Sequence, residues 1–157
     1  MNIGLLHGPN LNLLGTRQPS LYGRATLAEI DEEARRLGRD LGVDVESFQS
    51  NREGDLIDWI HDRGPTVSGF VVNAAAYTHT SIALLDALVG VGRPFVEVHL
   101  TNLHTRSRFR RRSLLAEHAL GVIMGFGAGS YELGLRALVA HVRGTEAGAA
   151  ESKKGRG

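Results

Sequence analysis

The chain alternates between short apolar runs and longer segments with helical periodicity, and this alternation restricts its fold more than any other feature. The apolar runs predicted to be strands are residues 2–8, 43–50, 67–73, 94–100 and 121–127. The segments whose apolar residues recur at helical spacing are residues 26–42, 52–64, 80–92 and 130–144. Strands and helices that alternate through short connections form βαβ units with a parallel sheet. We therefore expect an α/β fold: a three-layer, doubly wound, parallel five-stranded sheet.

The chain length and the aperiodic end of the chain suggest one domain with a tail. At 157 residues the chain is long enough for a single well-packed core. We expect residues 1–143 to form one catalytic domain, and the small, polar residues 144–157 to form a disordered tail. The chain has no basic leader and no long apolar run, so we expect no membrane segment and a cytoplasmic location. It also has no cysteine, which excludes disulfides, thiolate metal sites and a cysteine nucleophile.

Polar residues gather where the predicted strands end. In open α/β sheets, ligands bind outside the carboxyl ends of the strands. The segments that follow these ends are residues 7–12, 49–51, 73–80 and 99–110. Asn73 is followed by three small residues and then by the start of a helix, where free N–H groups can bind an anion such as a carboxylate. Thr80 and Ser81 are equally suited to capping that helix.

Residues 99–113, "HLTNLHTRSRFRRRS", contain two histidines and five arginines, a pattern that raises the question of nucleic-acid binding. A nucleic-acid-binding domain usually carries a large or one-sided positive charge. Here 18 Lys and Arg stand against 17 Asp and Glu, a net charge of +1, and Phe109 is the only aromatic residue in the segment. We therefore expect a site for a small anion, no nucleic-acid partner and no membrane partner.

Two further patterns permit a cofactor or a metal but favour neither. The glycine-rich residues 125–134 partly match a dinucleotide-binding loop, yet Ser130 replaces its third glycine and no further strand follows, so close helix–strand packing is favoured. Glu97 and His99 lie on one face of a predicted strand. The chain has no HxxxH or HExxH pair, so a carboxylate that orients the histidine is favoured over a metal site.

The loop of residues 8–23 is long for a connection between a strand and a helix, and long loops in compact domains are often functional. Arg17 and Tyr22 stand five positions apart in its second half, which could act as a lid. The alternative is a solvated arginine and a packing tyrosine.

Five segments of the chain together resemble type II 3-dehydroquinate dehydratases, in the order and spacing of that family's motifs. These segments are "GPNLNLLGTRQPSLYG", "FQSNREGDLIDWIH", "NAAAYTHTSIALLDAL", "EVHLTNLHTR" and "FRRRS", within residues 2–143. The resemblance implies a flavodoxin-like fold and a dodecamer built from trimers. It also implies conversion of 3-dehydroquinate to 3-dehydroshikimate, in the shikimate or quinate pathway, with no metal and no organic cofactor.

The resemblance also implies which residues perform the reaction. Loss of water from a β-hydroxy ketone needs a base for the α-proton, stabilisation of the enolate, and an acid for the departing hydroxyl. Tyr22 is the implied base, Arg17 is suited to favour its phenolate form, and Asn10 would hold a water against the enolate oxygen. His99 is the implied acid, and Glu97 could fix its orientation and support its protonated form.

Other positions match the family's substrate-binding residues. These are Asn73, His79, Asp86, Leu100, Thr101 and Arg110, with Arg106 in a supporting role. The family supplies the residue at the position of Asp86 from a neighbouring subunit, so the resemblance implies that a monomer lacks a complete site.

The chain departs from the family's motifs at several positions. Ala74-Ala75 stands where Pro-Gly or Pro-Ala is frequent, Thr101 where serine is common, and Ser107 where glutamate is usual. Arg111 and Arg112 occupy positions that often hold histidine. These departures leave one alternative open, a catalytically impaired paralogue that binds a dehydroquinate-like ligand.

Overall fold

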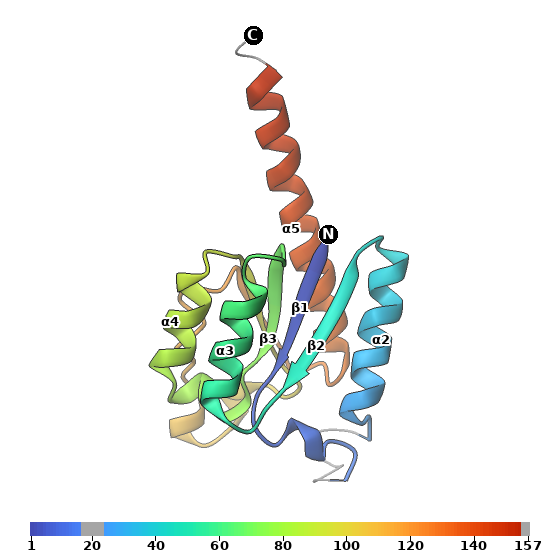
Figure 1. Ribbon diagram of the computed structural model, residues 1–157. Helices are drawn as coiled ribbons and strands as arrows, with labels where there is room; N and C mark the ends of the chain where they lie inside the picture. Colours follow the sequence, from blue (N-terminus) through green and yellow to red (C-terminus); the bar gives the residue numbers. More distant parts are fainter. Residues whose placement is uncertain (17–23, 155–157) are drawn as a thin grey trace.

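The computed structural model describes residues 1–16 and 24–154 and has the predicted architecture, a parallel sheet between two layers of helices (Figure 1). The strands are β1 (Asn2–His7), β2 (Asp44–Gln49), β3 (Gly69–Asn73), β4 (Phe95–His99) and β5 (Gly121–Met124), in the spatial order β2-β1-β3-β4-β5. The helices are α2 (Leu27–Asp40), α3 (Glu53–Arg63), α4 (Ile82–Gly90) and α5 (Gly129–Lys154). All strand pairs are parallel, and this order is that of flavodoxin-like folds. The predicted fold class is confirmed.

Each face of the sheet is covered by one pair of helices, because side chains of a strand alternate between the two faces. Leu5, Val71 and Val98 point to one side and form a core with α2 and α5. Phe70 and Val72 point to the other side and pack with residues of α3 and α4. The continuous apolar runs in the sequence reflect this burial on both faces.

The helices begin at residues that the sequence pattern indicates. Thr26 caps α2, since its side chain accepts a hydrogen bond from the Glu29 N–H while the Glu29 carboxylate accepts one from the Thr26 N–H at 2.7 Å. Of the two candidates for capping α4, Ser81 is the cap, with its hydroxyl 2.8 Å from the Leu84 N–H. This cap lies immediately after η2 (Ala75–His79), a short 3-10 turn that carries part of the predicted site.

The C-terminal segment differs from the expected disordered tail, because α5 continues to Lys154. Its last turns extend away from the sheet rather than packing on it (Figure 1). The segment after Gly144, "TEAGAAESKK", lacks apolar periodicity but contains alanine, glutamate and lysine, which are strong helix formers. Absence of apolar periodicity therefore did not mean absence of a helix. Residues 155–157 lie outside the described residues.

The fold brings the ends of β1, β3 and β4 together at one edge. β1 lies between β2 and β3, so the chain reverses its winding direction between β1 and β3, and such switch points form a crevice for ligands. Among the described residues, none of the helices is long and apolar enough to cross a membrane.

Candidate active site

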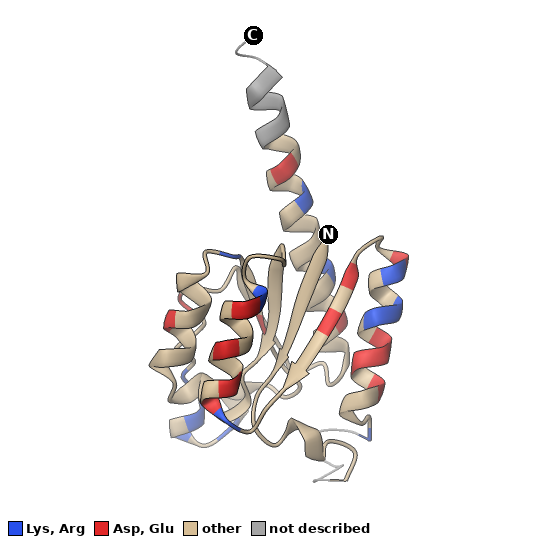
Figure 2. Cartoon of the chain, in the orientation of Figure 1, with Lys and Arg blue, Asp and Glu red and all other residues tan. Residues whose placement is uncertain are grey.

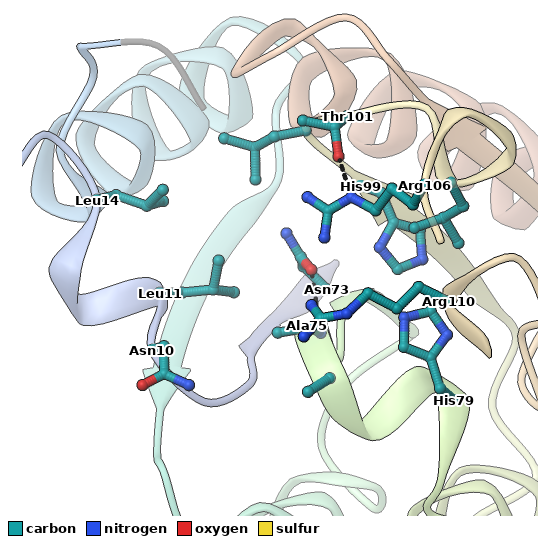
Figure 3. A pocket seen from close by; sticks show the side chains of 13 residues that line it. Asn10, Leu11, Leu14, Asn73, Ala75, His79, His99, Thr101, Arg106 and Arg110 are labelled. Carbon is teal, nitrogen blue, oxygen red and sulfur yellow. Dashed lines mark hydrogen bonds between the residues drawn. The ribbon is translucent and has the colours of Figure 1, made fainter. Parts of the chain in front are cut away.

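A pocket opens at the carboxyl ends of β1, β3 and β4, where the sequence predicts a site (Figure 3). The predicted residues that line it are Asn10, Asn73, His79, His99, Leu100, Thr101, Arg106 and Arg110. The lining residues that were not predicted are Leu11, Leu14, Ala75, Ala76 and Leu103. Leu11 and Leu14, at η1, lie on one side of the pocket, and the labelled histidine and arginine side chains lie across from them (Figure 3).

His99 and Glu97 form a buried pair at the end of β4. The ring Nε2 of His99 lies 2.7 Å from Oε1 of Glu97, and the two side chains are 6% and 0% exposed. Since Nε2 faces the carboxylate, Nδ1 is the ring nitrogen available to the pocket that His99 lines. The orientation predicted from the alternation of strand side chains is present.

Two hydroxyl groups that were not predicted complete the surroundings of Glu97. Thr78, in η2, donates a hydrogen bond to Oε1 of Glu97, and Oγ of Ser113 lies 2.8 Å from each carboxylate oxygen. Burial by itself raises the pKa of Glu97, but the hydrogen bonds from His99, Thr78 and Ser113 together bring that pKa below its ordinary value of 4.5. Glu97 is therefore a buried carboxylate that stays ionised beside the His99 ring.

His79 is held by the backbone of the arginine-rich segment. Its Nδ1 lies 2.7 Å from the carbonyl oxygen of Arg112. A carbonyl oxygen only accepts hydrogen bonds, so Nδ1 carries a proton and Nε2 is left for the pocket. Arg112 holds His79 through its backbone carbonyl, so this hydrogen bond does not depend on which side chain stands at position 112.

The arginine cluster divides between the pocket and the surface. Arg106 and Arg110 line the pocket, and Nε of Arg106 donates a 3.1 Å hydrogen bond to the hydroxyl of Thr101 (Figure 3). Arg108, Arg111 and Arg112 are exposed, and Figure 2 shows basic residues gathered at this end of the molecule. Two of the five arginines therefore face the site.

Two residues of the pocket have a left-handed backbone. Asn10, before η1 (Leu11–Leu13), has φ 67°, and its N–H donates to Oδ1 of Asn51 at 2.8 Å. Ala75 has φ 51°, a conformation that glycine adopts more easily than alanine. This positive φ angle explains why glycine is frequent at the same position in similar motifs. Here the N–H of Ala75 donates to Oδ1 of Asn73 at 3.2 Å, and this bond supports the turn.

Behind the pocket, Asn73 connects to a second buried network that the sequence did not indicate. Its Nδ2 donates to the hydroxyl of Tyr131 at 2.9 Å, and that hydroxyl lies 3.1 Å from Nδ1 of His7. Nε2 of His7 lies 2.8 Å from Oδ1 of Asp31 in α2. His7 and Asn73 are paired in register between β1 and β3, whereas Tyr131, in α5, is 58 residues away from Asn73 in the chain.

Two predicted residues in the described part of the chain, Glu97 and Asp86, do not line this pocket. Asp86 lies exposed on α4 and is not among the lining residues. Arg17 and Tyr22 lie outside the described residues. Among residues 1–16 and 24–154, no three histidine and acidic side chains are grouped closely enough to hold a metal ion.

The glycine-rich loop after β5 supports the end of β4. The N–H of Gly125 donates to the carbonyl of His99 at 3.2 Å, and that of Gly127 donates to the carbonyl of Leu100 at 2.9 Å. Close helix–strand packing, as predicted, occurs at Gly134, where a Cβ would lie 2.6 Å from a methyl group of Val98. The loop therefore fixes the backbone that carries two of the pocket residues.

Comparisons with known proteins agree on one family. The family model described as "Dehydroquinase class II" matches residues 1–139. A protein named 3-dehydroquinate dehydratase from Synechococcus sp. (strain WH7803) is 54% identical over 147 residues, which cover 94% of this chain and 100% of the relative. Another of that name, from Gemmatimonas aurantiaca, is 55% identical over 139 residues, 88% of this chain and 91% of the relative.

A solved structure is similar along most of its length. The crystal structure of type II dehydroquinase from Propionibacterium acnes has a TM-score of 0.85 to this chain. It is 40% identical in sequence, and the alignment covers 88% of this chain and 96% of that one.

Proposed function

The chain belongs to the class II dehydroquinase family and is a hydro-lyase that dehydrates 3-dehydroquinate, and we propose that the pocket beside His99 carries out this reaction through an enolate. One observation carries the proposal. A histidine that lines the pocket is bonded to a fully buried carboxylate, which hydroxyl groups and the histidine keep ionised. A general acid gives up a proton from its imidazolium form, and an ionised carboxylate in contact with the ring can balance that positive charge and hold the ring in place.

In the proposed reaction, Tyr22 removes the α-proton and Arg17 supports its phenolate. Asn10, at the edge of the pocket, holds a water that donates to the enolate oxygen. The enolate then expels the β-hydroxyl group, which leaves as water with the proton of His99. Glu97 balances the charge of the imidazolium before transfer and holds the ring in place afterwards.

The remaining pocket residues are proposed to bind the substrate. Arg110 has donors arranged for a carboxylate or for neighbouring hydroxyl groups. Nε2 of His79 faces a substrate hydroxyl, and the Leu100-Thr101 segment supplies backbone N–H and hydroxyl groups. Arg106 keeps the Thr101 hydroxyl in position through its hydrogen bond. Asn73 contributes its amide group.

We further propose that Asp86 completes the site of a neighbouring subunit in a dodecamer built from trimers. Ile82, Asp86 and Val89 recur at helical spacing on one face of α4, and Ile82 and Val89 are 64% and 48% exposed. Large apolar side chains that flank an exposed carboxylate suit a contact between subunits. Measurement of the oligomer mass tests this proposal, and a monomer with full activity would contradict it.

We also propose that residues 1–143 are the catalytic domain and that the enzyme acts in the cytoplasm, in the biosynthetic shikimate or the catabolic quinate pathway.

The departures from the family's motifs leave the pocket intact. Ser107 is exposed, does not line the pocket, and accepts a backbone hydrogen bond from Arg110 at 2.8 Å. Ala74 and Ala75 preserve the turn after Asn73. Neither observation favours an impaired paralogue.

The decisive experiment is an absorbance assay with 3-dehydroquinate. The purified protein should produce the ultraviolet absorbance of the conjugated enone in 3-dehydroshikimate. Tyr22→Phe and His99→Ala should each lose most activity while the fold, measured by circular dichroism, is retained. No absorbance change from a folded oligomer would overturn the proposed site, and near-wild-type turnover in either variant would remove that residue from its role.

A further inference from the structure

A chain of buried hydrogen bonds runs from the pocket through the core to α2. It passes from Asn73 to the Tyr131 hydroxyl (2.9 Å), to His7 (3.1 Å), and to Asp31 (2.8 Å). His7, Tyr131 and Asn73 are 0%, 2% and 2% exposed. Ser47, in β2, donates to the second oxygen of Asp31 at 2.9 Å. Of these residues only Asn73 lines the pocket, so the proposed reaction uses none of the other groups.

The direction of every bond in this chain follows from one fixed donor. The backbone N–H of Ala75 can only donate, so the atom of Asn73 that faces it is Oδ1 and the atom that faces Tyr131 is Nδ2. Nδ2 donates to the Tyr131 oxygen, and the phenolic hydrogen is then directed to Nδ1 of His7. His7 must therefore be neutral with its hydrogen on Nε2, which donates to Asp31.

The opposite arrangement leaves a buried group without a partner. If Nδ1 of His7 carried a hydrogen, Tyr131 would accept from both His7 and Asn73, and its own O–H would have no acceptor in this chain. An unpaired hydroxyl at a site that is 2% exposed is strongly unfavourable. Asp31, as an acceptor for Nε2–H, thus selects the tautomer of His7 that keeps Asn73 in one orientation.

We propose that Tyr131, His7 and Asp31 are positioning residues that hold the Asn73 amide in the orientation in which it binds substrate. In this orientation one N–H of Nδ2 and one lone pair of Oδ1 remain for the hydroxyl groups of the ligand. The inference rests on the proposed role of Asn73 in substrate binding. It predicts that breaking the hydrogen-bond chain behind the pocket raises the KM for 3-dehydroquinate.

Tyr131→Phe tests the proposal with little change in side-chain volume. It removes the acceptor of Nδ2, so that only the Ala75 N–H still holds the Asn73 amide in the pocket. We expect KM for 3-dehydroquinate to rise about 3- to 10-fold, the equivalent of one hydrogen bond, with a smaller change in kcat. Val142→Ala is the matched control, because Val142 lies in the same core cluster and on the same helix. It should lower thermal stability and leave KM unchanged.

A pair of variants at Asp31 separates hydrogen bonding from charge. Asp31→Asn retains an oxygen that accepts from Nε2 of His7 and an amide that can donate to Ser47, so KM should remain near that of the wild type. Asp31→Leu removes the acceptor and should raise KM in the same direction as Tyr131→Phe. The tautomer is read directly from nitrogen-15 NMR of the histidine ring, where His7 should show a hydrogen on Nε2.

Unchanged KM in folded Tyr131→Phe, an equal increase in Val142→Ala, or a His7 hydrogen on Nδ1 would each overturn the proposal. If Tyr131→Phe does not fold, the Asp31 variants and the tautomer decide. Absence of turnover by the wild-type enzyme would instead contradict the proposed function, and the His7 tautomer would still test the hydrogen-bond chain.

Discussion

Two histidine–carboxylate pairs stand at the ends of β1 and β4, with β3 between them, and lie on opposite faces of the sheet. His99 and Glu97 follow Phe95 in the alternation of β4 and lie on the side of α3 and α4. His7 follows Leu5 in β1 and lies on the side of α2 and α5, where Asp31 meets it. The nitrogen–oxygen distances, 2.7 and 2.8 Å, are nearly the same. Pair geometry alone does not distinguish them.

The two pairs differ in what the second ring nitrogen meets. In both, Nε2 faces the carboxylate. Nδ1 of His99 is left for a pocket, where it can transfer a proton to a ligand. Nδ1 of His7 meets the hydroxyl of Tyr131 in the interior, where a proton has no ligand to reach. In the roles proposed above, the same kind of pair therefore serves acid catalysis at one strand end and positioning at the other.

The carboxylates differ in their access to water. Glu97 is fully buried, and hydroxyl groups of the protein share its oxygens with His99. The side chain of Asp31 is 17% exposed, and Arg35 lies 3.9 Å from its second oxygen. Loss of a protein donor should therefore disturb Glu97 more than Asp31, because water can replace a donor only at the exposed site.

Exchange of each histidine for alanine should separate the two roles most strongly. His99→Ala removes the proposed acid and should lower kcat by about 10²- to 10⁴-fold. His7→Ala should retain kcat within about tenfold, but it leaves a buried cavity and unpaired groups on Tyr131 and Asp31, which together cost about 2–4 kcal/mol. Steady-state kinetics and denaturant unfolding measure the two effects. Equal losses of kcat would show that both pairs act in the chemistry.

Neutral amides in place of the carboxylates should have the next largest effect. Glu97→Gln removes the negative charge that supports protonated His99, so kcat should fall, by about 10²-fold if most of the acid contribution is lost. Asp31→Asn still accepts from His7 and should retain kcat. The kcat ratio of the two variants is the measurement. A similar loss of kcat in both variants would indicate that kcat depends on the negative charge at long range and not on the contact of a carboxylate with a pocket histidine.

The fold was predictable from sequence because its signals are local. The strands, the helices and the Thr26 cap follow from patterns within a few residues of each other. His99 and Glu97 were also recognisable as a pair, because side chains two residues apart share a strand face.

The supporting groups were not predictable in this way. Thr78 and Ser113 reach Glu97 from 19 and 16 residues away, and Tyr131 reaches His7 from 124 residues away. No sequence period links such distances, since only the tertiary packing of η2, of α5 and of the loop that holds Ser113 brings these hydroxyl groups into contact. The family resemblance named most of the polar residues that line the pocket and not the hydrogen-bond chain behind Asn73.

Acid should weaken the two pairs in different pH ranges. For each carboxylate, burial acts to raise the pKa, but the hydrogen bond from its histidine and those from hydroxyl groups bring the net pKa below the ordinary value. A lowered folded-state pKa gives stability that is present above the unfolded-state pKa and is lost as the pH falls through the folded-state pKa.

Wild-type stability should therefore decline below about pH 4.5 through Glu97, and below about pH 3.8 through Asp31. Denaturant unfolding at a series of pH values measures this decline. Glu97→Gln should reduce the decline in stability that begins near pH 4.5, and Asp31→Asn should reduce the decline that begins near pH 3.8. A decline that neither variant changes would mean that neither carboxylate is stabilised in the folded state.

Removal of one hydroxyl group that donates a hydrogen bond to each carboxylate should give the smallest effects and the most direct comparison of the two pairs. Thr78→Val conserves shape but deprives fully buried Glu97 of a donor, which should destabilise the protein by about 1–3 kcal/mol and lower kcat with it. Ser47→Ala removes a donor from Asp31, where water and Arg35 can compensate, so the loss should stay below about 1 kcal/mol. Equal losses would contradict the view that water access separates the pairs, because Asp31 would then depend on its protein donors as strongly as Glu97 does.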